Sequence, residues 1–347
     1  MKRGDEAAIV QARVSCARPR PPPIRIRRDR GKRRAVRARE LGLPKSPVCQ
    51  NQGKRGARVR LAVIIATTGR ADLLARTVAQ LARQTRAPDR IIVIGVTEAD
   101  TAGVRAPAGI ALDVIRAERG LPRQRNAGLR HLAGQADVAA FFDDDFVPAH
   151  DYLAVLEREF QARPGLVGAT ALLLADGIKS PGIAFDEAAA MVDAHRPRAV
   201  INERRLPALY GCNLCVRLSA AEGLWFDEAL PLYGWQEDVD FSYRLGQKGL
   251  LVETSQLSGV HLGAKGGRAS GKRLGYSQIA NPVYLLRKQT IPPRLALRLM
   301  GRNLLANCAR SLWPEPYVDR LGRLCGNLTA LIDLARGRID PRRILEL

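Results

Sequence analysis

Short continuous runs of apolar residues alternate with segments in which apolar residues recur every three to four positions. The runs 61–66 and 91–94 have the length and composition of strands buried on both faces. Between them, residues 72–86 have the spacing of an amphipathic helix, and Pro88 ends it. The order strand, helix, strand predicts a largely parallel, doubly wound α/β sheet.

The alternation continues to residue 252, with one interruption. Residues 178–206 combine glycine, proline and mixed charges without a period, and we expect them to be irregular. The pattern predicts further strands over 112–115, 138–142, 167–174, 210–218 and 250–252, and helices over 124–132, 152–162 and 237–246.

The region after Pro282 is basic and has a helical pattern. Its apolar positions, three to four residues apart, include Leu297, Met300, Leu304 and Cys308, and its arginines recur every four residues at Arg294, Arg298 and Arg302. This pattern predicts an amphipathic helix with a cationic face. Such a helix either lies in the interface of an anionic membrane or packs on the protein with its arginines in water, and the sequence leaves both open.

The net charge of +22 is concentrated near the N-terminus, where residues 1–60 contain 19 Lys or Arg and 4 Asp or Glu. Residues 1–58 are rich in Arg and Pro without an apolar period, so we expect a disordered basic tail. The tail is either an electrostatic arm for anionic lipid or nucleic acid, or a segment without a specific role. We expect a folded domain over 59–275 and a basic helical extension over 276–347.

Hydrophobic segments and cysteines narrow the class of protein. No apolar stretch reaches the roughly 18 to 20 residues of a membrane-spanning helix, and no apolar segment follows the first positive charges as in a secretory signal. Six scattered cysteines indicate reduced thiols in a cytoplasmic protein. Cys212 and Cys215 form a C-x-x-C pair, but without a second pair or nearby histidines we favour two thiols on a strand over a zinc site.

Three consecutive carboxylates follow the predicted strand 138–142 directly: Asp143, Asp144 and Asp145. Adjacent like charges are unfavourable unless water or a cation neutralises them. The carboxyl edge of an open α/β sheet is where ligands bind. The triplet is therefore either a divalent-metal site that holds a phosphorylated substrate or a solvated acidic turn.

A second acidic stretch opens the predicted helix 237–246. Glu237 and Asp238 lie in its first turn, where the helix dipole favours ionised carboxylates. Asp240 and Arg244 are four residues apart and can pair along one face. An ionised Asp beside an aromatic platform such as Trp235 suits a general base acting on a sugar hydroxyl; the alternative is the charged first turn of a surface helix.

These stretches and the strand-turn opening together resemble the nucleotide-sugar-dependent glycosyltransferases of family 2, over roughly residues 59–265. The resemblance implies the GT-A fold, a Rossmann-like, mostly parallel doubly wound α/β sheet, here with a helical C-terminal extension. In the turn after the first strand, 66–70, Thr67 and Arg70 match the family pattern, whereas its proline, aromatic residue and asparagine are missing.

The resemblance also implies which residues bind the nucleotide-sugar donor and its metal ion. Segment 120–128 is similar to the family's Gly-x-x-x-x-Arg-Asn-x-Gly, and Asp143–Asp145 to its D-x-D. Lys265 and Arg268 of a glycine-rich loop are expected to complement phosphate charge. The implied donor-nucleotide residues are Thr67, Arg70, Glu98, Asp100, Arg125, Asn126, Asp143 and Asp144, and the implied ligands of Mn²⁺ or Mg²⁺ are Asp145 and His261; for His261 an ordinary loop histidine is the alternative.

On the acceptor side, segment 211–217 is similar to the family's Gly-x-Asn-x-x-x-Arg, and 234–244 to its E-D-x-D-x-x-x-R, in which the Asp after the Glu is the base. This implies Asp238 as the catalytic base and Asn213, Trp235 and Glu237 as acceptor-binding residues. The implied reaction is metal-dependent sugar transfer to an acceptor hydroxyl with inversion at the anomeric carbon.

The expected partners are a nucleotide-sugar donor, a glycan or lipid-linked acceptor and an anionic membrane surface. The expected setting is polysaccharide or glycoconjugate assembly in the cytoplasm, with peripheral attachment to the inner face of the plasma membrane. A sugar-phosphate nucleotidyltransferase is an alternative, but it would have a Gly-rich basic loop after the first strand, and 66–70 has one Gly and one Arg. A nucleic-acid or anion binder acting through the tail is another; no finger or aromatic-interleaved basic sheet supports it, so no specific nucleic acid is expected.

Overall fold

The structure is a computed structural model that describes residues 58–197, 200–266, 270–313 and 315–347. Residues 1–57, which make up nearly all of the predicted basic tail, lie outside the described residues, as does Arg268. The described residues all belong to one compact unit.

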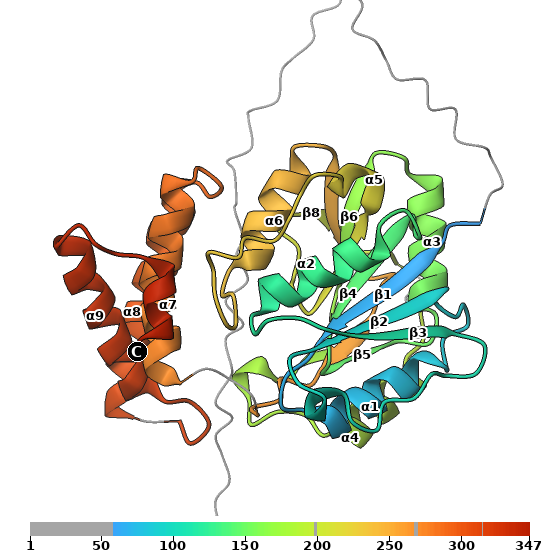
Figure 1. The fold of residues 1–347 in the computed structure, drawn as a ribbon, viewed down its shortest axis with the longest axis horizontal. Coiled ribbons are helices and arrows are strands. Elements are labelled where there is room, and N and C mark those ends of the chain that lie inside the picture. Colours follow the sequence, from blue (N-terminus) through green and yellow to red (C-terminus); the bar gives the residue numbers. More distant parts are fainter. Residues whose placement is uncertain (1–57, 198–199, 267–269, 314) are drawn as a thin grey trace, which may run out of the picture. The chain divides into compact units, whose positions relative to one another are not determined.

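An eight-stranded sheet forms the centre of this unit, in the order β3-β2-β1-β4-β9-β6-β10-β8 (Figure 1). All neighbours are parallel except around β9 and β8, so the predicted mostly parallel α/β sheet is confirmed. The strands are β1 Leu61–Ala66, β2 Arg90–Gly95, β3 Ala111–Arg116, β4 Val138–Asp143, β6 Leu166–Ala171, β8 Glu203–Arg205, β9 Asn213–Arg217 and β10 Leu250–Thr254.

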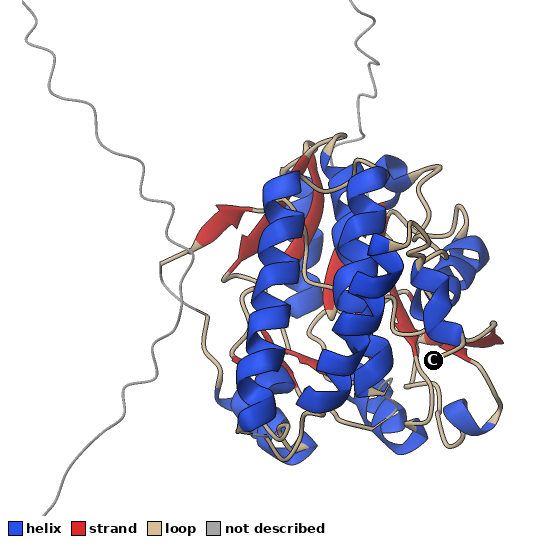
Figure 2. Cartoon of the chain, turned by 90° about the vertical axis from the view of Figure 1, so that its left-hand side faces the viewer, coloured by secondary structure: helices blue, strands red, loops and turns tan. Residues whose placement is uncertain are grey.

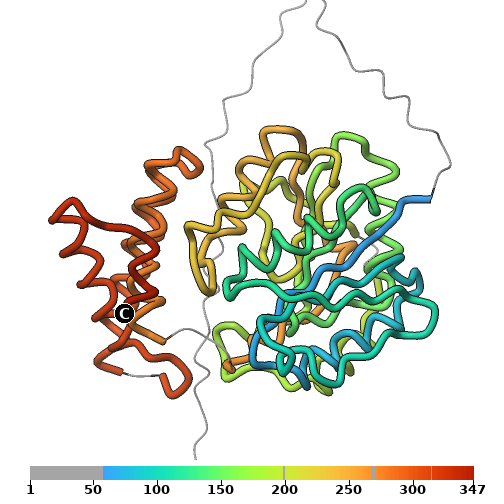
Figure 3. The backbone as a smooth tube through the Cα atoms, in the orientation of Figure 1, coloured from blue at the N-terminus to red at the C-terminus, as the bar shows by residue number. Residues whose placement is uncertain are grey.

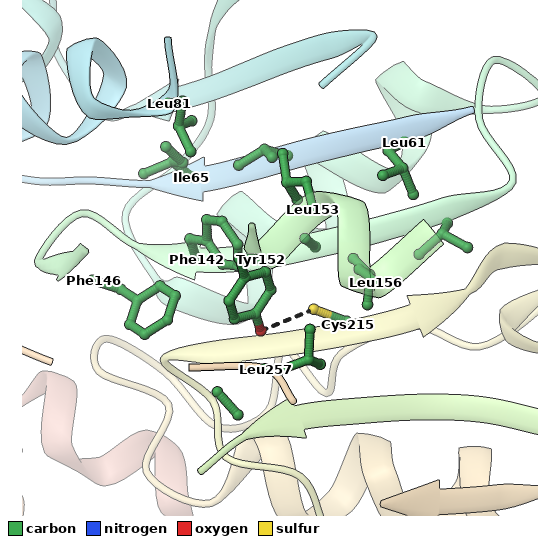
Figure 4. Close-up of a cluster of buried hydrophobic side chains, with 14 of the residues drawn as sticks. Leu61, Ile65, Leu81, Phe142, Phe146, Tyr152, Leu153, Leu156, Cys215 and Leu257 are labelled. Carbon is green, nitrogen blue, oxygen red and sulfur yellow. Dashed lines mark hydrogen bonds between the residues drawn. The ribbon is translucent and has the colours of Figure 1, made fainter. Parts of the chain in front are cut away.

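Helices cover both faces of the sheet, as the continuous apolar runs predict. Val63 and Ile65 of β1 pack on the face covered by α1 and α3, a cluster drawn in Figure 4, whereas Ile64 packs on the face covered by α2 and α6. The helices of this part are α1 Ala71–Leu81, α2 Leu121–Leu132, α3 Tyr152–Ala162, α4 Phe185–Ala194, α5 Leu218–Ala221 and α6 Glu237–Gly246, with 3₁₀ turns at Ala99–Thr101 and Gly177–Lys179.

A second sheet of three short strands lies beyond the end of β4, in the order β5-β11-β7. Its strands are β5 Phe146–Pro148, β11 Gly259–His261 and β7 Ala175–Asp176. The expectation that 178–206 is irregular is wrong, because α4 and β8 lie within it. Ala188 and Val192 of α4 are buried, and their spacing is the helical signal in that segment.

Three helices and a 3₁₀ turn make up residues 271–347, which we call the C-terminal extension from here on: α7 Gly271–Arg287, α8 Pro293–Leu312, α9 Arg320–Ala335 and Pro341–Leu345. Figure 3 traces them in orange to red as far as the C-terminus. Gly275 and Gly326 let α7 and α9 touch, since a Cβ at Gly275 would lie 2.0 Å from the Arg323 carbonyl oxygen. The predicted amphipathic helix is present as α8, but Leu297 and Cys308 on its apolar side are exposed, and the buried residues are Ala296 and Asn307.

Polar contacts join the extension to the rest of the unit. Lys288, directly after the last residue of α7, lies 2.5 Å from Asp227 and 2.8 Å from Asp240 of α6. The Asn281 amide donates to the Trp235 carbonyl oxygen at 2.6 Å, just before α6. In the described parts of the chain, no helix combines the length and hydrophobicity that crossing a membrane requires.

Candidate active site

Asp143, Asp145 and His261 come together at the carboxyl end of β4. Each offers one ligand atom, and these atoms all lie within 4.8 Å of one another. Asp143 is the last residue of β4, and the pairing of β11 with β5 places His261 opposite Phe146, next to Asp145. A three-residue strand thus joins parts of the site that are distant in sequence.

Two carboxylates and an imidazole suit Mn²⁺ or Mg²⁺ as ligands. Burial raises the pKa of Asp143, although Arg125 opposes this. Burial acts likewise on Asp145, but the hydrogen bond and charge of His261 prevail and lower the pKa of Asp145 to about 2. Since a cation would relieve the repulsion between the two carboxylates, these residues fit a divalent metal ion.

His261 is oriented by Asp176, a residue that no motif of the sequence indicates. His261 Nδ1 lies 2.9 Å from Asp176 Oδ1, and the Tyr210 hydroxyl donates to Asp176 Oδ2 at 3.1 Å. Burial lowers the pKa of His261, but Asp145 and Asp176 raise it to about 10. A carboxylate on Nδ1 leaves Nε2, which faces Asp145 at 3.5 Å, as the ligand atom.

Asp144, the middle carboxylate, supports the turn after β1. Its side chain is fully buried, accepts a hydrogen bond from Thr67 Oγ1 at 2.6 Å and lies 2.6 Å from an Arg70 nitrogen. Burial raises the pKa of Asp144 to about 7, against the attraction of Arg70. Because Asp144 has no exposed surface, it can affect a molecule in the neighbouring cleft only through Thr67 and Arg70, which line that cleft.

Arg125 joins the two acidic stretches. Its side chain is 2% exposed and lies 2.6 Å from Glu237 Oε1 and 3.1 Å from Asp143 Oδ1, and it donates to the Gly211 carbonyl oxygen at 2.7 Å. The stretches 143–145 and 237–240 therefore lie at one site. Since these contacts occupy both terminal nitrogens, Arg125 holds carboxylates in place and does not present a free guanidinium to phosphate.

Asp238, the predicted base, lies in the first turn of α6. Its Oδ2 accepts from the Gly211 backbone amide and its Oδ1 from the Val239 amide, both at 2.9 Å. Burial raises the pKa of Asp238, while Arg125 and the two amides favour the ionised form. Gly211 has to be small, since a Cβ there would lie 3.0 Å from Asp238 Oδ2.

The residues around Asp238 are mostly buried. Glu237 is 3% exposed, and burial raises its pKa to about 8 despite Arg125. Trp235 is half-buried, and its carbonyl oxygen accepts from Asn281 of the extension. The α6 N-terminus is thus held by Gly211, just before β9, and by Asn281 of α7.

Asn126 and Asn213 are committed to protein contacts. The Asn126 side chain is buried and exchanges hydrogen bonds with the Phe226 backbone at 2.8 and 2.9 Å. Asn213 Oδ1 accepts from Thr170 Oγ1 at 2.6 Å and from the Ala171 amide at 2.7 Å. A nucleotide contact by Asn126 or an acceptor contact by Asn213 would require these bonds to open.

The two carboxylates expected near the nucleobase differ in environment. Asp100 is 6% exposed and accepts from the backbone amides of Gly69 at 2.6 Å and Thr97 at 2.7 Å, so it joins the turns after β1 and β2. Glu98 is exposed and lies 3.0 Å from Arg116. Neither carboxylate is among the residues that line the cleft described next.

A cleft of about 160 Å³ opens beside Asp143, between the end of β1, the start of α2 and the start of α7. Thr67, Arg70 and Asp143 line it, as expected of donor-side residues. Further lining residues, which the sequence analysis did not select, include Arg119, Tyr233, Ser270 and Arg273. Three arginines therefore line the cleft, Arg70, Arg119 and Arg273, and Arg273 comes from the extension.

Residues 62–173 match the family described as Glycosyl transferase family 2. Among solved structures, the chain is similar to the mannosyltransferase PcManGT from Pyrobaculum calidifontis in complex with GDP-Man and Mn²⁺, at 17% identity, 80% coverage of this chain, 89% of that chain and a TM-score of 0.50. It is also similar to GalNAc-T7 with UDP, GalNAc and Mn²⁺, at 16% identity, 84% coverage of this chain, 56% of that chain and a TM-score of 0.49. A third similar structure is S. aureus TarS 1-349, at 12% identity, 82% coverage of each chain and a TM-score of 0.49. No curated protein matches the sequence.

The sheet and its helical layers define the GT-A fold, which the likeness to PcManGT supports. The chain is a glycosyltransferase, and segment 62–173 belongs to family 2. The resemblance to family 2 is confirmed, and the matched segment contains Asp143–Asp145 but not the second acidic stretch, 237–240. The roles of individual residues stay predictions.

Proposed function

We propose that the protein transfers a sugar from a nucleoside-diphosphate sugar to an acceptor hydroxyl, with inversion at the anomeric carbon and Asp238 as general base. The observation that carries this proposal is the position of Arg125, which contacts Asp143 at 3.1 Å and Glu237 at 2.6 Å. It brings the predicted metal cluster and the predicted base to one site.

The cleft beside Asp143 is the proposed donor site. Arg70, Arg119 and Arg273 line it, and guanidinium groups pair well with diphosphate oxygens. Asp143, Asp145 and His261 would hold Mn²⁺ or Mg²⁺. When bound there, the ion would supply Lewis-acid neutralisation of the leaving diphosphate.

Asp238 would accept the proton of the acceptor hydroxyl. Its two backbone hydrogen bonds fix the carboxylate and favour its ionised form, which a base requires. Trp235, three residues before Asp238 and half-buried, would offer an aromatic surface for a sugar ring. Attack from the Asp238 side, opposite the departing diphosphate, leads to inversion.

The setting that we propose is polysaccharide or glycoconjugate assembly at the inner face of the plasma membrane, with a glycan or lipid-linked acceptor. The basic helices of the extension support this setting. A nucleotidyltransferase is not favoured, because the turn after β1 carries no Gly-rich basic loop.

A donor screen tests the proposal. Thermal shift with UDP-, GDP- and dTDP-sugars, with and without Mn²⁺, should show one nucleotide class that stabilises the protein only with metal. NMR of the product from the selected donor should show an inverted anomeric configuration. If no donor stabilises the protein with metal, the donor site is refuted; a retained configuration refutes the role of Asp238.

A further inference from the structure

Exposed large hydrophobic side chains concentrate on two helices of the extension. Of the fourteen that are exposed among the described residues, seven lie between positions 297 and 332. They are Leu297 (65% exposed), Leu305 (71%), Leu312 (73%), Trp313 (72%), Leu321 (64%), Leu328 (49%) and Ile332 (50%), and we name them the extension face. Clustered exposed apolar side chains mark an interaction surface, whereas scattered ones do not.

On α8, exposed leucines and arginines share one side of the helix. Leu305 and Leu312 are seven residues apart and therefore share one side of the helix. Arg294, Arg298 and Arg302, four residues apart, are exposed and lie on the same side, between and next to these leucines. None of these three arginines forms an ion pair with a carboxylate in the described parts of the chain, and α8 itself contains no Asp or Glu.

On α9, the exposed apolar residues form a narrower stripe. Leu321, Leu328 and Ile332 are seven and four residues apart, so they lie above one another on one side. The opposite side of α9 is buried: Asn327 bonds Asn307 of α8 at 2.8 Å and the Gly275 carbonyl oxygen of α7 at 2.6 Å. The stripe thus lies on the side of α9 that faces away from its packing partners. Figure 2 presents the side of the molecule that carries α8 and α9.

The charge of the extension identifies the class of partner. Residues 271–347 contain fourteen Lys or Arg and five Asp or Glu, a net charge of +9. A second copy of this chain would bring like charges together across a two-fold interface, which is unfavourable. Apolar side chains beside arginines, with an exposed Trp at the helix end, are the pattern of helices in the headgroup region of an anionic bilayer.

We propose that the extension face docks on an anionic lipid bilayer, with its leucines and Trp313 at the level of the acyl boundary and Arg294, Arg298 and Arg302 on lipid phosphates. The inference specifies the surface that would serve the membrane setting proposed above, and it does not depend on the proposed reaction. Since Arg273 of the same extension lines the cleft beside Asp143, docking would hold the active site near the membrane plane.

Vesicle sedimentation of the full chain tests this proposal. The protein should bind phosphatidylglycerol/phosphatidylcholine vesicles and bind pure phosphatidylcholine much more weakly. The double variant Leu305→Glu/Leu312→Glu should lose roughly tenfold or more in affinity for the anionic vesicles. Val200→Glu is the matched control, since Val200 is 72% exposed outside the extension, and it should bind like the unmodified protein.

Fluorescence separates this face from the basic N-terminal segment, which every variant retains. Lipids brominated in the acyl chain should quench Trp313, and Trp313→Phe should abolish most of the quenching. Circular dichroism checks that each variant is folded. Unchanged vesicle affinity of the double variant, or no quenching, would overturn the proposal; so would a dimer in light scattering that the double variant abolishes, since the face would then join two copies.

Discussion

The guanidinium of Arg125 lies 2.6 Å from Glu237 Oε1, and both side chains are almost completely buried. These residues are 112 positions apart and belong to α2 and α6. A buried charge pair is stable only while both partners are present. The pair therefore fixes the distance between the metal cluster and the predicted base.

Replacing Arg125 should damage both stability and activity. Arg125→Leu leaves Glu237 and Asp143 without their cation, and we expect a loss of roughly 3–5 kcal/mol in the free energy of unfolding, measured by urea denaturation. Arg123→Leu on the same helix is the control; Arg123 is 44% exposed, so its loss should cost less than about 1 kcal/mol. Equal urea midpoints for the two variants would contradict a bridging role.

Asp238→Asn should lower kcat by roughly 10² to 10⁴, as expected when a general base is lost. The amide retains the size of the side chain, so donor affinity measured by calorimetry should change little. Asp186→Asn is the control, because Asp186 is 87% exposed and lies on α4. Near-normal turnover of the Asp238 variant would exclude it as the base.

The pH profile of kcat/KM should have its acid limb above the ordinary range of an aspartate. The base works only when ionised, so activity falls as pH drops through its pKa, and burial raises the pKa of Asp238 above 3.8. Arg125 lowers that pKa, so Arg125→Leu should move the limb to higher pH. If the acid limb of kcat/KM stays at the same pH in the Arg125→Leu variant, Arg125 does not influence the group whose ionisation limits activity.

Asp145→Ala and His261→Ala should each abolish or strongly weaken Mn²⁺-dependent binding of nucleoside diphosphate, because each removes one donor from the cluster. Isothermal calorimetry with Mn²⁺ and UDP or GDP measures this directly. Asp186→Asn again serves as the control. An isotherm identical to that of the unmodified protein would refute the metal site.

Asp176→Ala should weaken Mn²⁺ binding by roughly 10- to 100-fold while leaving some binding, because Asp176 orients His261 and is not expected to coordinate the ion itself. Titration of free Mn²⁺ by electron paramagnetic resonance gives the affinity without an activity assay. Tyr210→Phe removes only the hydroxyl that donates to Asp176, so its effect should be smaller. Equal losses in the Asp176 and Asp145 variants would make Asp176 a ligand.

The sequence predicts helices and strand ends correctly where the signal lies within a single segment. The helix predicted over 237–246 is α6, and the helix over 152–162 is α3. The acidic triplet stands at the carboxyl end of β4, because an apolar run that meets charge must end at the edge of the sheet.

What the sequence could not show depends on contacts between distant segments. Asp176 and His261 meet only because β7 and β11 pair, and β7 has two residues, too few for a periodic signal. Arg273 enters the cleft through the packing of α7. Asn126 and Asn213 matched family motifs, yet their side chains are occupied by protein partners, which no motif reveals.

The contact between Lys288 and Asp240 bears on how this enzyme can be divided. Asp240 is completely buried, and its cationic neighbours are Arg244 of its own helix and Lys288 at the end of α7. Removing the chain from α7 onwards, to obtain a smaller catalytic fragment, would take away one counter-ion of the Asp240 carboxylate. It would also remove the Asn281 amide that donates to the Trp235 carbonyl oxygen. Any chimera that exchanges the last three helices has to supply an equivalent lysine and amide.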